Sequence, residues 1–132
     1  MKTKDTLLEA LGIEIISASE QRVEATMPVD ERTRQPFGLL HGGASVALAE
    51  TVASLGAIKS VDLEKEICVG LEINANHIKG KKDGIVTAIG VPLHKGKKTA
   101  VWEVKIQDEE ENLICISRCT LAILPKAKHK NA

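Results

Sequence analysis

The chain has 132 residues, a length at which a single domain removes roughly two thirds of its extended surface from water. Basic and acidic residues both number 18, and Phe37 and Trp102 are the only aromatic residues, so we expect no nucleic-acid partner. No apolar run reaches membrane-spanning length, and the first nine residues are charged where a signal peptide would be apolar. We therefore expect a soluble, cytoplasmic protein without a membrane partner.

Hydrophobic periodicity predicts a short helix, a hairpin, a long helix and four further strands, in that order. Because successive strands are joined by short polar turns, we expect an antiparallel sheet of about six strands curled around the long helix. This α+β domain covers residues 1–125, and a basic C-terminal tail covers 126–132. The expected elements are a helix within 3–11, strands at 13–18 and 22–28, a helix at 44–58, and strands at 68–78, 84–94, 99–108 and 113–124.

The three cysteines, Cys68, Cys115 and Cys119, lie inside apolar runs. They lack the paired spacing of a zinc site or a redox motif. We expect reduced thiols in the core, and we expect neither a metal nor a cofactor.

Residues 35–59 carry the candidate chemistry. A loop with the sequence Gln-Pro-Phe-Gly-Leu-Leu leads into His41 and Gly42, and the helix that follows is small and apolar, with Glu50 as its only charged residue. Such a helix is expected to be buried on nearly every face, which would remove the Glu50 carboxylate from water. A buried carboxylate is paired, protonated or used in chemistry, and the helix offers no cation before Lys59.

These residues resemble the acyl-CoA thioesterases of the hotdog fold, in the branch with a glutamate on the central helix. The resemblance is carried by the loop from Gln35 to Ser45 together with Glu50, and also by 69–77 and 96–102. It implies hydrolysis of an acyl-CoA, as in the 1,4-dihydroxy-2-naphthoyl-CoA, phenylacetyl-CoA and 4-hydroxybenzoyl-CoA thioesterases, and hence menaquinone or aromatic acid metabolism. It also implies a homotetramer.

Thioester hydrolysis needs donors for the carbonyl oxygen and a base or nucleophile for the carbonyl carbon. The N–H groups of Gly42 and Gly43 are expected to be unpaired at the start of the helix, and Gln35 adds a side-chain donor. Glu50 would attack the carbonyl or deprotonate a water, and Ser54, one turn later, faces the same side. The pocket for the acyl group is expected to be floored by aliphatic residues, Leu39, Leu40, Val52 and Leu55.

The same residues also have structural interpretations. His41 would cap the helix or act in catalysis, and the resemblance favours a hydrogen-bonding role near the thioester. In the structural interpretation, Gly42 only permits a tight turn, and Glu50 forms an ion pair with a lysine. The alternative function is a non-catalytic acyl-CoA binding or regulatory module of the same fold, which the retained acid Glu50 disfavours. A hydratase of this architecture would need an aspartate and a histidine on the approach to the helix.

Helix geometry predicts the assembly. Gly42 and Glu50 are eight residues apart, which corresponds to about 12 Å of rise and roughly 80° around the helix axis. One carbonyl therefore does not reach both residues within a chain. If both serve one substrate, two copies place their central helices antiparallel, so that Gly42 of one meets Glu50 of the other. We expect a homodimer with two shared sites as the minimum active unit.

Two lysine-rich turns, at 79–82 and 95–98, are candidates to bind the phosphates of coenzyme A. The strand between them is about 33 Å long, so the two turns are expected at opposite ends of the sheet and one chain cannot use both on one ligand. In an alternative interpretation, these lysines are solvated and prevent strand edges from pairing with other chains. The resemblance implies nucleotide contacts, drawn from different subunits, by His77, Lys79, Gly96, Lys97 and Thr99.

Overall fold

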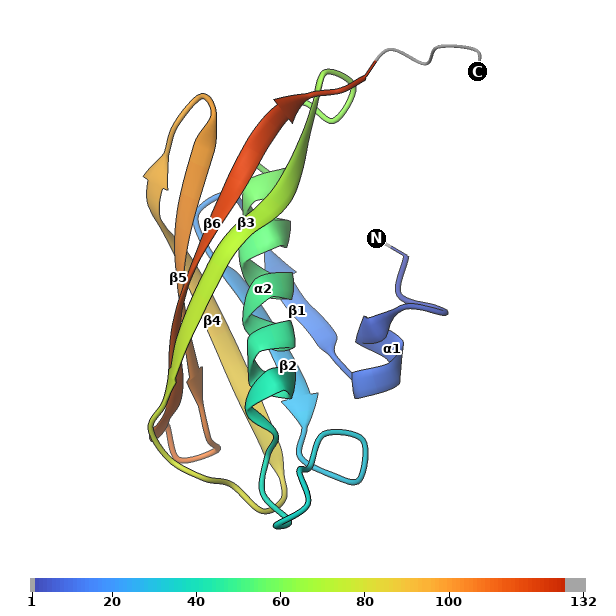
Figure 1. Ribbon diagram of the computed structural model, residues 1–132, viewed down its shortest axis with the longest axis vertical. Helices are drawn as coiled ribbons and strands as arrows, with labels where there is room; N and C mark the ends of the chain where they lie inside the picture. The colour runs from blue at the N-terminus through green and yellow to red at the C-terminus, as the bar shows by residue number, and fades with distance from the viewer. Residues whose placement is uncertain (1, 128–132) are drawn as a thin grey trace.

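In the computed structural model, which describes residues 2–127, one antiparallel six-stranded sheet curves around a single long helix (Figure 1). The strand order is β1-β2-β4-β5-β6-β3. This is the hotdog arrangement of the α+β class, as the resemblance implies. No helix within residues 2–127 is both long and apolar enough to cross a bilayer. The elements are α1 Leu7–Leu11, β1 Glu14–Ala18, β2 Val23–Pro28, α2 Gly42–Ile58, β3 Glu66–His77, β4 Ile85–Lys95, β5 Thr99–Gln107 and β6 Leu113–Pro125.

All the expected elements occur, and each strand agrees with its expected bounds to within two residues. The first helix is shorter than expected because Thr6 has an extended backbone and begins the helix as its N-cap. Gly12 ends the helix in the left-handed conformation, as predicted. Lys126, at the start of the expected basic tail, donates its N–H to a carbonyl of the loop before β3 (2.8 Å), and residues 128–132 lie outside the described residues.

The core lies between α2 and the concave face of the sheet. Trp102 on β5 is fully buried there, and a Cβ at Gly56 on α2 would collide with its ring, so glycine lets helix and sheet approach closely. Val52 of α2 is also fully buried and packs on Gly90 of β4. The prediction that Val52 floors a ligand pocket is therefore wrong, because its side chain faces the sheet.

The cysteines follow the prediction closely. Cys115 and Cys119 are buried on β6, Cys68 is half-buried on β3, and all three are free thiols. Burial raises the pKa of each thiol, to about 11 for Cys119. They are therefore packing residues, with thiols that stay protonated at neutral pH.

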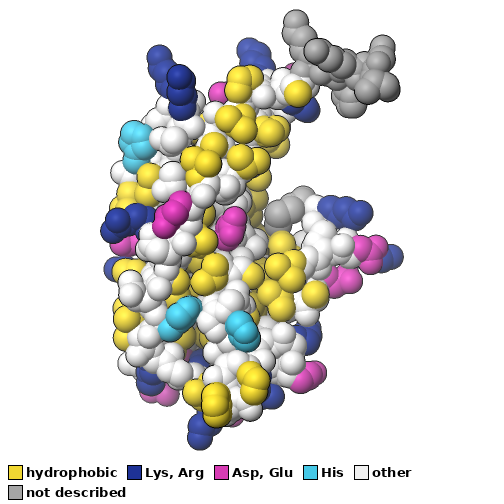
Figure 2. All heavy atoms as spheres, in the orientation of Figure 1, with side chains coloured by type: hydrophobic (Ala, Val, Ile, Leu, Met, Phe, Trp, Pro, Cys, Tyr) yellow, Lys and Arg dark blue, Asp and Glu magenta, His cyan; other side chains and the backbone are white. Residues whose placement is uncertain are grey.

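α2 is less buried than expected, and Glu50 is half-exposed instead of being withdrawn from water. The sheet covers one side of the helix, while α1 stands beside it without closing over it (Figure 1). Apolar and acidic side chains therefore reach the surface side by side on this face of the molecule (Figure 2). The half-exposed positions of the helix are Gly42, Val46, Ala47, Glu50, Thr51, Ser54 and Ile58.

β3 forms one edge of the sheet and pairs only with β6. Its register shifts between Gly70 and Glu72, and Leu71 at this irregularity is 60% exposed. Ile67 and Val69 are also exposed, so this long edge strand carries apolar side chains in water. Such an edge is a template for pairing with another strand.

Candidate active site

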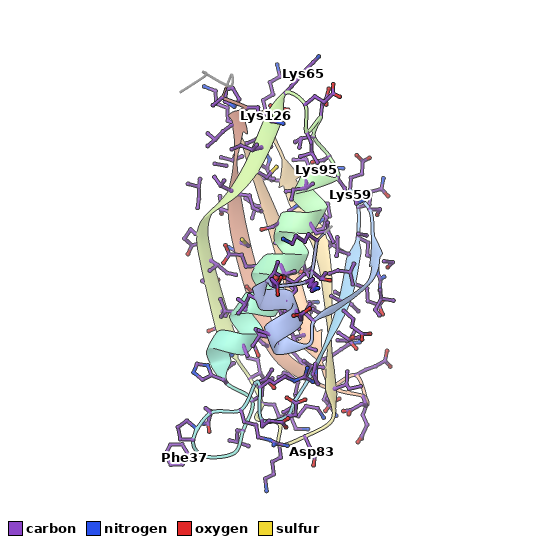
Figure 3. The ribbon with its side chains drawn as sticks, turned by 90° about the vertical axis from the view of Figure 1, so that its right-hand side faces the viewer. Phe37, Lys59, Lys65, Asp83, Lys95 and Lys126 are labelled. Atoms are coloured by element: carbon purple, nitrogen blue, oxygen red, sulfur yellow. The ribbon has the colours of Figure 1, made fainter. Side chains whose placement is uncertain are left out.

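The loop before α2 is shaped by the Gln35 side chain. Its amide oxygen accepts the N–H groups of Phe37 and Leu39. This arrangement fixes the side chain and leaves its NH2 group as a donor, as the prediction for Gln35 requires. Phe37, at the far point of the loop, is 89% exposed (Figure 3).

His41 caps α2. Its N–H donates to the carbonyl of the buried Thr33 (2.8 Å), and its Nδ1 accepts the N–H of Gly43 (2.7 Å). The expectation that both glycine N–H groups are unpaired is therefore wrong for Gly43, because the preceding histidine satisfies it. Within residues 2–127 the Gly42 N–H has no hydrogen-bond partner. Because Nδ1 accepts, the ring proton of neutral His41 is on Nε2, which can donate.

Gly42 opens into a hollow of about 240 Å³, here called the Gly42 cavity. Gln35 lines the same cavity, so the structure brings the two predicted carbonyl donors together. It also brings them next to His77 and Lys79, two of the predicted coenzyme A contacts. A Cβ on Gly42 would lie 2.8 Å from His77 Nε2, so the ring would have to shift to accept a larger residue there. Leu39 and Leu40 also line this cavity.

Glu50 lines a second and larger hollow of about 490 Å³ between α1 and α2, here called the α1–α2 groove. Ser54 lines it too, as the helical spacing predicts, and the groove is mainly apolar. Leu55 also lines this groove, whereas Leu39 and Leu40 line the Gly42 cavity, so within one chain the expected aliphatic residues do not floor a single pocket. Among residues 2–127 no hydrogen bond or ion pair engages the Glu50 carboxylate, so the lysine-paired interpretation finds no support within the described chain. Its Oε2 lies against Gly70 of β3, where a Cβ would collide with it.

The two halves of the predicted chemistry are thus separate within one chain. Gly42 and Gln35 face one hollow, and Glu50 and Ser54 face another. This separation agrees with the helix geometry, which places the two ends of the motif on different turns.

The two lysine-rich turns lie at opposite ends of the molecule, as predicted. In Figure 3 the label of Asp83 marks the end of the molecule with the turn at 79–82, and the label of Lys95 marks the end with the turn at 95–98. Gly96 and Lys97 line a third hollow of about 440 Å³, far from His77. The Thr99 carbonyl accepts the Gly96 N–H (2.9 Å) and so shapes this turn.

Sequence reasoning did not single out Gly70. An isolated glycine inside a strand is a signal of close approach by another group, and here that group is the Glu50 carboxylate. The structure contains no cluster of three or more His, Cys, Asp or Glu side chains placed to hold a metal ion within residues 2–127.

The sequence model of the thioesterase superfamily matches residues 37–115, which include α2 and most of the sheet. The chain belongs to the thioesterase superfamily. This thioesterase is 61% identical over 126 residues to "Putative esterase ComA2" of Bacillus subtilis, covering 96% of this chain and all of that one. It is 53% identical over 122 residues to the 1,4-dihydroxy-2-naphthoyl-CoA hydrolase of Listeria monocytogenes, covering 92% of this chain and 98% of that one.

Solved structures give the same assignment. Crystal structures of two variants of SAV0944 from Staphylococcus aureus, one of them described as a thioesterase enzyme, superpose on this thioesterase with TM-scores of 0.89 and 0.88 at 48% identity. The alignments cover 92% and 90% of this chain, and 100% and 98% of those chains. The chain is therefore a thioester hydrolase with the hotdog fold.

Proposed function

We propose that this thioesterase hydrolyses acyl-CoA at a site shared by two subunits, with Glu50 from one and Gln35 and Gly42 from the other. The observation that carries the proposal is a pair of unsatisfied groups on one helix. The Gly42 N–H and the Glu50 carboxylate both lack partners within residues 2–127, and they face different hollows. Each group supplies what the other lacks for attack on a thioester.

The carbonyl oxygen of the substrate would accept hydrogen bonds from the Gly42 N–H and the Gln35 amide. The N-terminal end of α2 adds its positive dipole to this site, which favours the negative charge that develops on that oxygen. His41 fixes the start of the helix and offers Nε2–H as a further donor nearby.

Glu50 acts on the carbonyl carbon from the other side. It either attacks to form an anhydride, which water then opens, or takes a proton from a water that attacks directly. In both routes the C–S bond breaks, coenzyme A leaves as the thiol after protonation of its sulfur, and the free acid is released. Ser54, in the same groove as Glu50, is suited to hold the water.

The edge strand β3 supports the shared site. Gly42 lies beside His77 at one end of β3, while Glu50 lies beside Gly70 in its middle. If β3 pairs antiparallel with β3 of a second copy so that His77 faces Gly70 of the partner subunit, Gly42 comes next to Glu50 of the partner subunit. The exposed apolar side chains of this edge would then be covered.

The same pairing bears on the coenzyme A contacts. A twofold axis turns the partner's Gly96–Thr99 end toward the end of the first subunit that carries His77 and Lys79. Both lysine-rich turns then approach one nucleotide from different subunits, which a single chain does not allow. Lys81 is an exception, because its ammonium already pairs with Glu109.

Relatives also support this assignment. The Listeria relative is named for the hydrolysis of an aromatic acyl-CoA, so we propose an aromatic or medium-chain acyl-CoA as substrate, in menaquinone or aromatic acid metabolism. The S. aureus protein was crystallised with alanine in place of a glutamine and, separately, of a glutamate; these two positions are fifteen residues apart, as are Gln35 and Glu50.

The test is complementation between two inactive variants, Glu50→Ala and Gln35→Ala, unfolded and refolded together at equal concentration. One of the two sites in each mixed dimer is then intact, so the mixture should recover about one quarter of wild-type coenzyme A release from benzoyl-CoA. The matched control mixes Glu50→Ala with Glu50→Gln, which leaves every site without its acid and should recover nothing.

Two outcomes would contradict the proposal. Mixed dimers, verified by mass spectrometry, that remain inactive would exclude the shared site. Wild type that binds acyl-CoA but releases no coenzyme A from an aromatic and aliphatic substrate panel would favour the binding module instead.

A further inference from the structure

The loop that carries Gln35 and leads to α2, residues 34–41 and here called the site loop, is held by the segment that joins β3 to β4. The Leu40 N–H donates to the Lys81 carbonyl (2.8 Å), and Arg34 Nε donates to the Lys82 carbonyl (2.8 Å). These two bonds bracket the site loop, because Arg34 and Leu40 also pair with each other in an isolated bridge. The position of the site loop therefore depends on the position of the backbone at 81 and 82.

That connecting segment, residues 79–84, has no strand partner of its own. Its two ends are held in place, since the Ile78 and Lys79 N–H groups donate to the Ile114 carbonyl (2.8 and 3.3 Å) and the Gly84 carbonyl accepts the Val29 N–H (2.8 Å). Between these ties every residue is exposed except Lys81, whose side chain is only 14% exposed. A lysine is rarely withdrawn from water without a charged partner.

The partner is Glu109, on the turn between β5 and β6. Its carboxylate accepts Lys81 Nζ at one oxygen and the Ile85 N–H at the other (2.9 Å). A Cβ at Gly84 would collide with the same carboxylate, so glycine is needed there for the close approach. The Glu109 side chain thus holds both Lys81, in the middle of the 79–84 segment, and Ile85, directly after it.

We propose that Glu109 is a positioning residue for the active site, acting through Lys81 on the site loop. The chain of contacts runs from the Glu109 carboxylate to Lys81 Nζ, from the Lys81 carbonyl to the Leu40 N–H, and along the site loop to the Gln35 amide and the start of α2. This inference rests on the proposed function, in which Gln35 and Gly42 polarise the thioester carbonyl.

The exposure of Glu109 separates this role from plain stabilisation. Glu109 is 53% exposed, and exposed ion pairs contribute little to the free energy of unfolding. Placement of catalytic groups, in contrast, is sensitive to shifts of a fraction of an ångström. Loss of the pair should therefore affect turnover more than folding.

The experiment compares Glu109→Ala, Glu109→Gln and the control Glu110→Ala in the full chain, with benzoyl-CoA as substrate and coenzyme A release as readout. The Glu110 side chain lies on the same turn and makes no hydrogen bond or ion pair within residues 2–127. We expect Glu109→Ala to lower kcat about tenfold, with KM within about twofold of wild type. Glu109→Gln, whose amide oxygen still accepts the Ile85 N–H, should fall between, and Glu110→Ala should match wild type.

A further measurement identifies the route of the effect. Hydrogen–deuterium exchange of residues 34–41 should accelerate in Glu109→Ala and not in Glu110→Ala.

Either a kcat of Glu109→Ala equal to wild type or unchanged exchange of the site loop would overturn the inference. Full activity of Gln35→Ala would instead refute the assigned role of Gln35 in the proposed function. In that case the exchange measurement and the kcat of the Glu109 variants still decide whether Glu109 positions the loop.

Discussion

The Glu50 carboxylate lies directly over the backbone of Gly70, and a Cβ at position 70 would collide with Oε2. The Glu50 side chain is thus positioned by the absence of a side chain at Gly70. No hydrogen bond positions it, since within residues 2–127 no donor engages its carboxylate. Glu50 is half-exposed, so its carboxylate remains available to a substrate or a water.

We predict that Gly70→Ala displaces the Glu50 side chain and lowers kcat by about ten- to a hundredfold. The displaced group is the far end of a flexible side chain, so the fold should persist, and circular dichroism with a thermal melt would verify this. Wild-type kcat in a folded Gly70→Ala protein would show that the contact does not orient the acid.

The contact between His77 and Gly42 gives a second prediction. In Gly42→Ala the new Cβ would lie 2.8 Å from His77 Nε2 and push the ring across the Gly42 cavity. We expect weaker binding of coenzyme A itself, measured by calorimetry, because the ring stands at the proposed nucleotide end. The His77→Ala background provides room for the extra methyl group. If Gly42→Ala costs as much affinity there as in the wild type, the steric explanation fails.

The fold was largely predictable because local signals agree with the global arrangement. Alternating strands and polar turns define the sheet, and Gly12 ends α1 as a left-handed cap. The loop-to-acid motif predicts site roles for Gln35 and Glu50, which stay predictions, and helical spacing correctly placed Ser54 in the same groove as the acid.

The remaining details depend on contacts between segments far apart in the sequence. His41 satisfies the Gly43 N–H, which composition alone does not reveal because a histidine before a helix serves several roles. Val52 faces the sheet, since the direction of each helix face is set by where the strands pack. The link from Glu109 to the site loop joins the turn between β5 and β6, the 79–84 segment and the loop before α2. No spacing in the sequence indicates this link.

A proline on the edge strand tests the assembly. We predict that Ala75→Pro weakens association: the Ile78 N–H donates to β6, so alternation along the strand turns the Ala75 N–H toward the free edge, where proline removes a donor and disfavours pairing. Activity should fall with dimer content, since each site requires groups from two chains. Sedimentation and coenzyme A release measured over the same range of protein concentration would show the two losses together; a fully active monomer would contradict the shared site.

Glu109 gives a small, pH-dependent contribution to stability, because its exposure to solvent screens the ion pair. The hydrogen bond from Lys81, followed by that from the Ile85 N–H, lowers the pKa of this carboxyl from its ordinary 4.5 to about 2. Because the folded-state pKa is depressed, its stabilising contribution is complete above about 4.5 and is lost as the pH falls from there toward 2. Urea unfolding at pH 6 and pH 3 should therefore show a smaller loss of stability in Glu109→Gln than in wild type. Equal losses in the two proteins would show that the contact has no linkage to folding.

The packing of Trp102 on Gly56 sets the distance between α2 and the sheet. Alanine normally stabilises a helix interior relative to glycine by about 0.5–1 kcal/mol. At position 56 the new Cβ would collide with the buried indole, so we predict instead that Gly56→Ala destabilises the protein by about 1–3 kcal/mol. In a Trp102→Phe background the smaller ring no longer reaches Gly56, so the same substitution should become neutral or stabilising there. Urea unfolding of all four proteins at one fixed protein concentration measures this reversal of sign. If Gly56→Ala stabilises the wild-type chain, the helix sits far enough from the sheet to accept a methyl group, and the close approach inferred here is wrong.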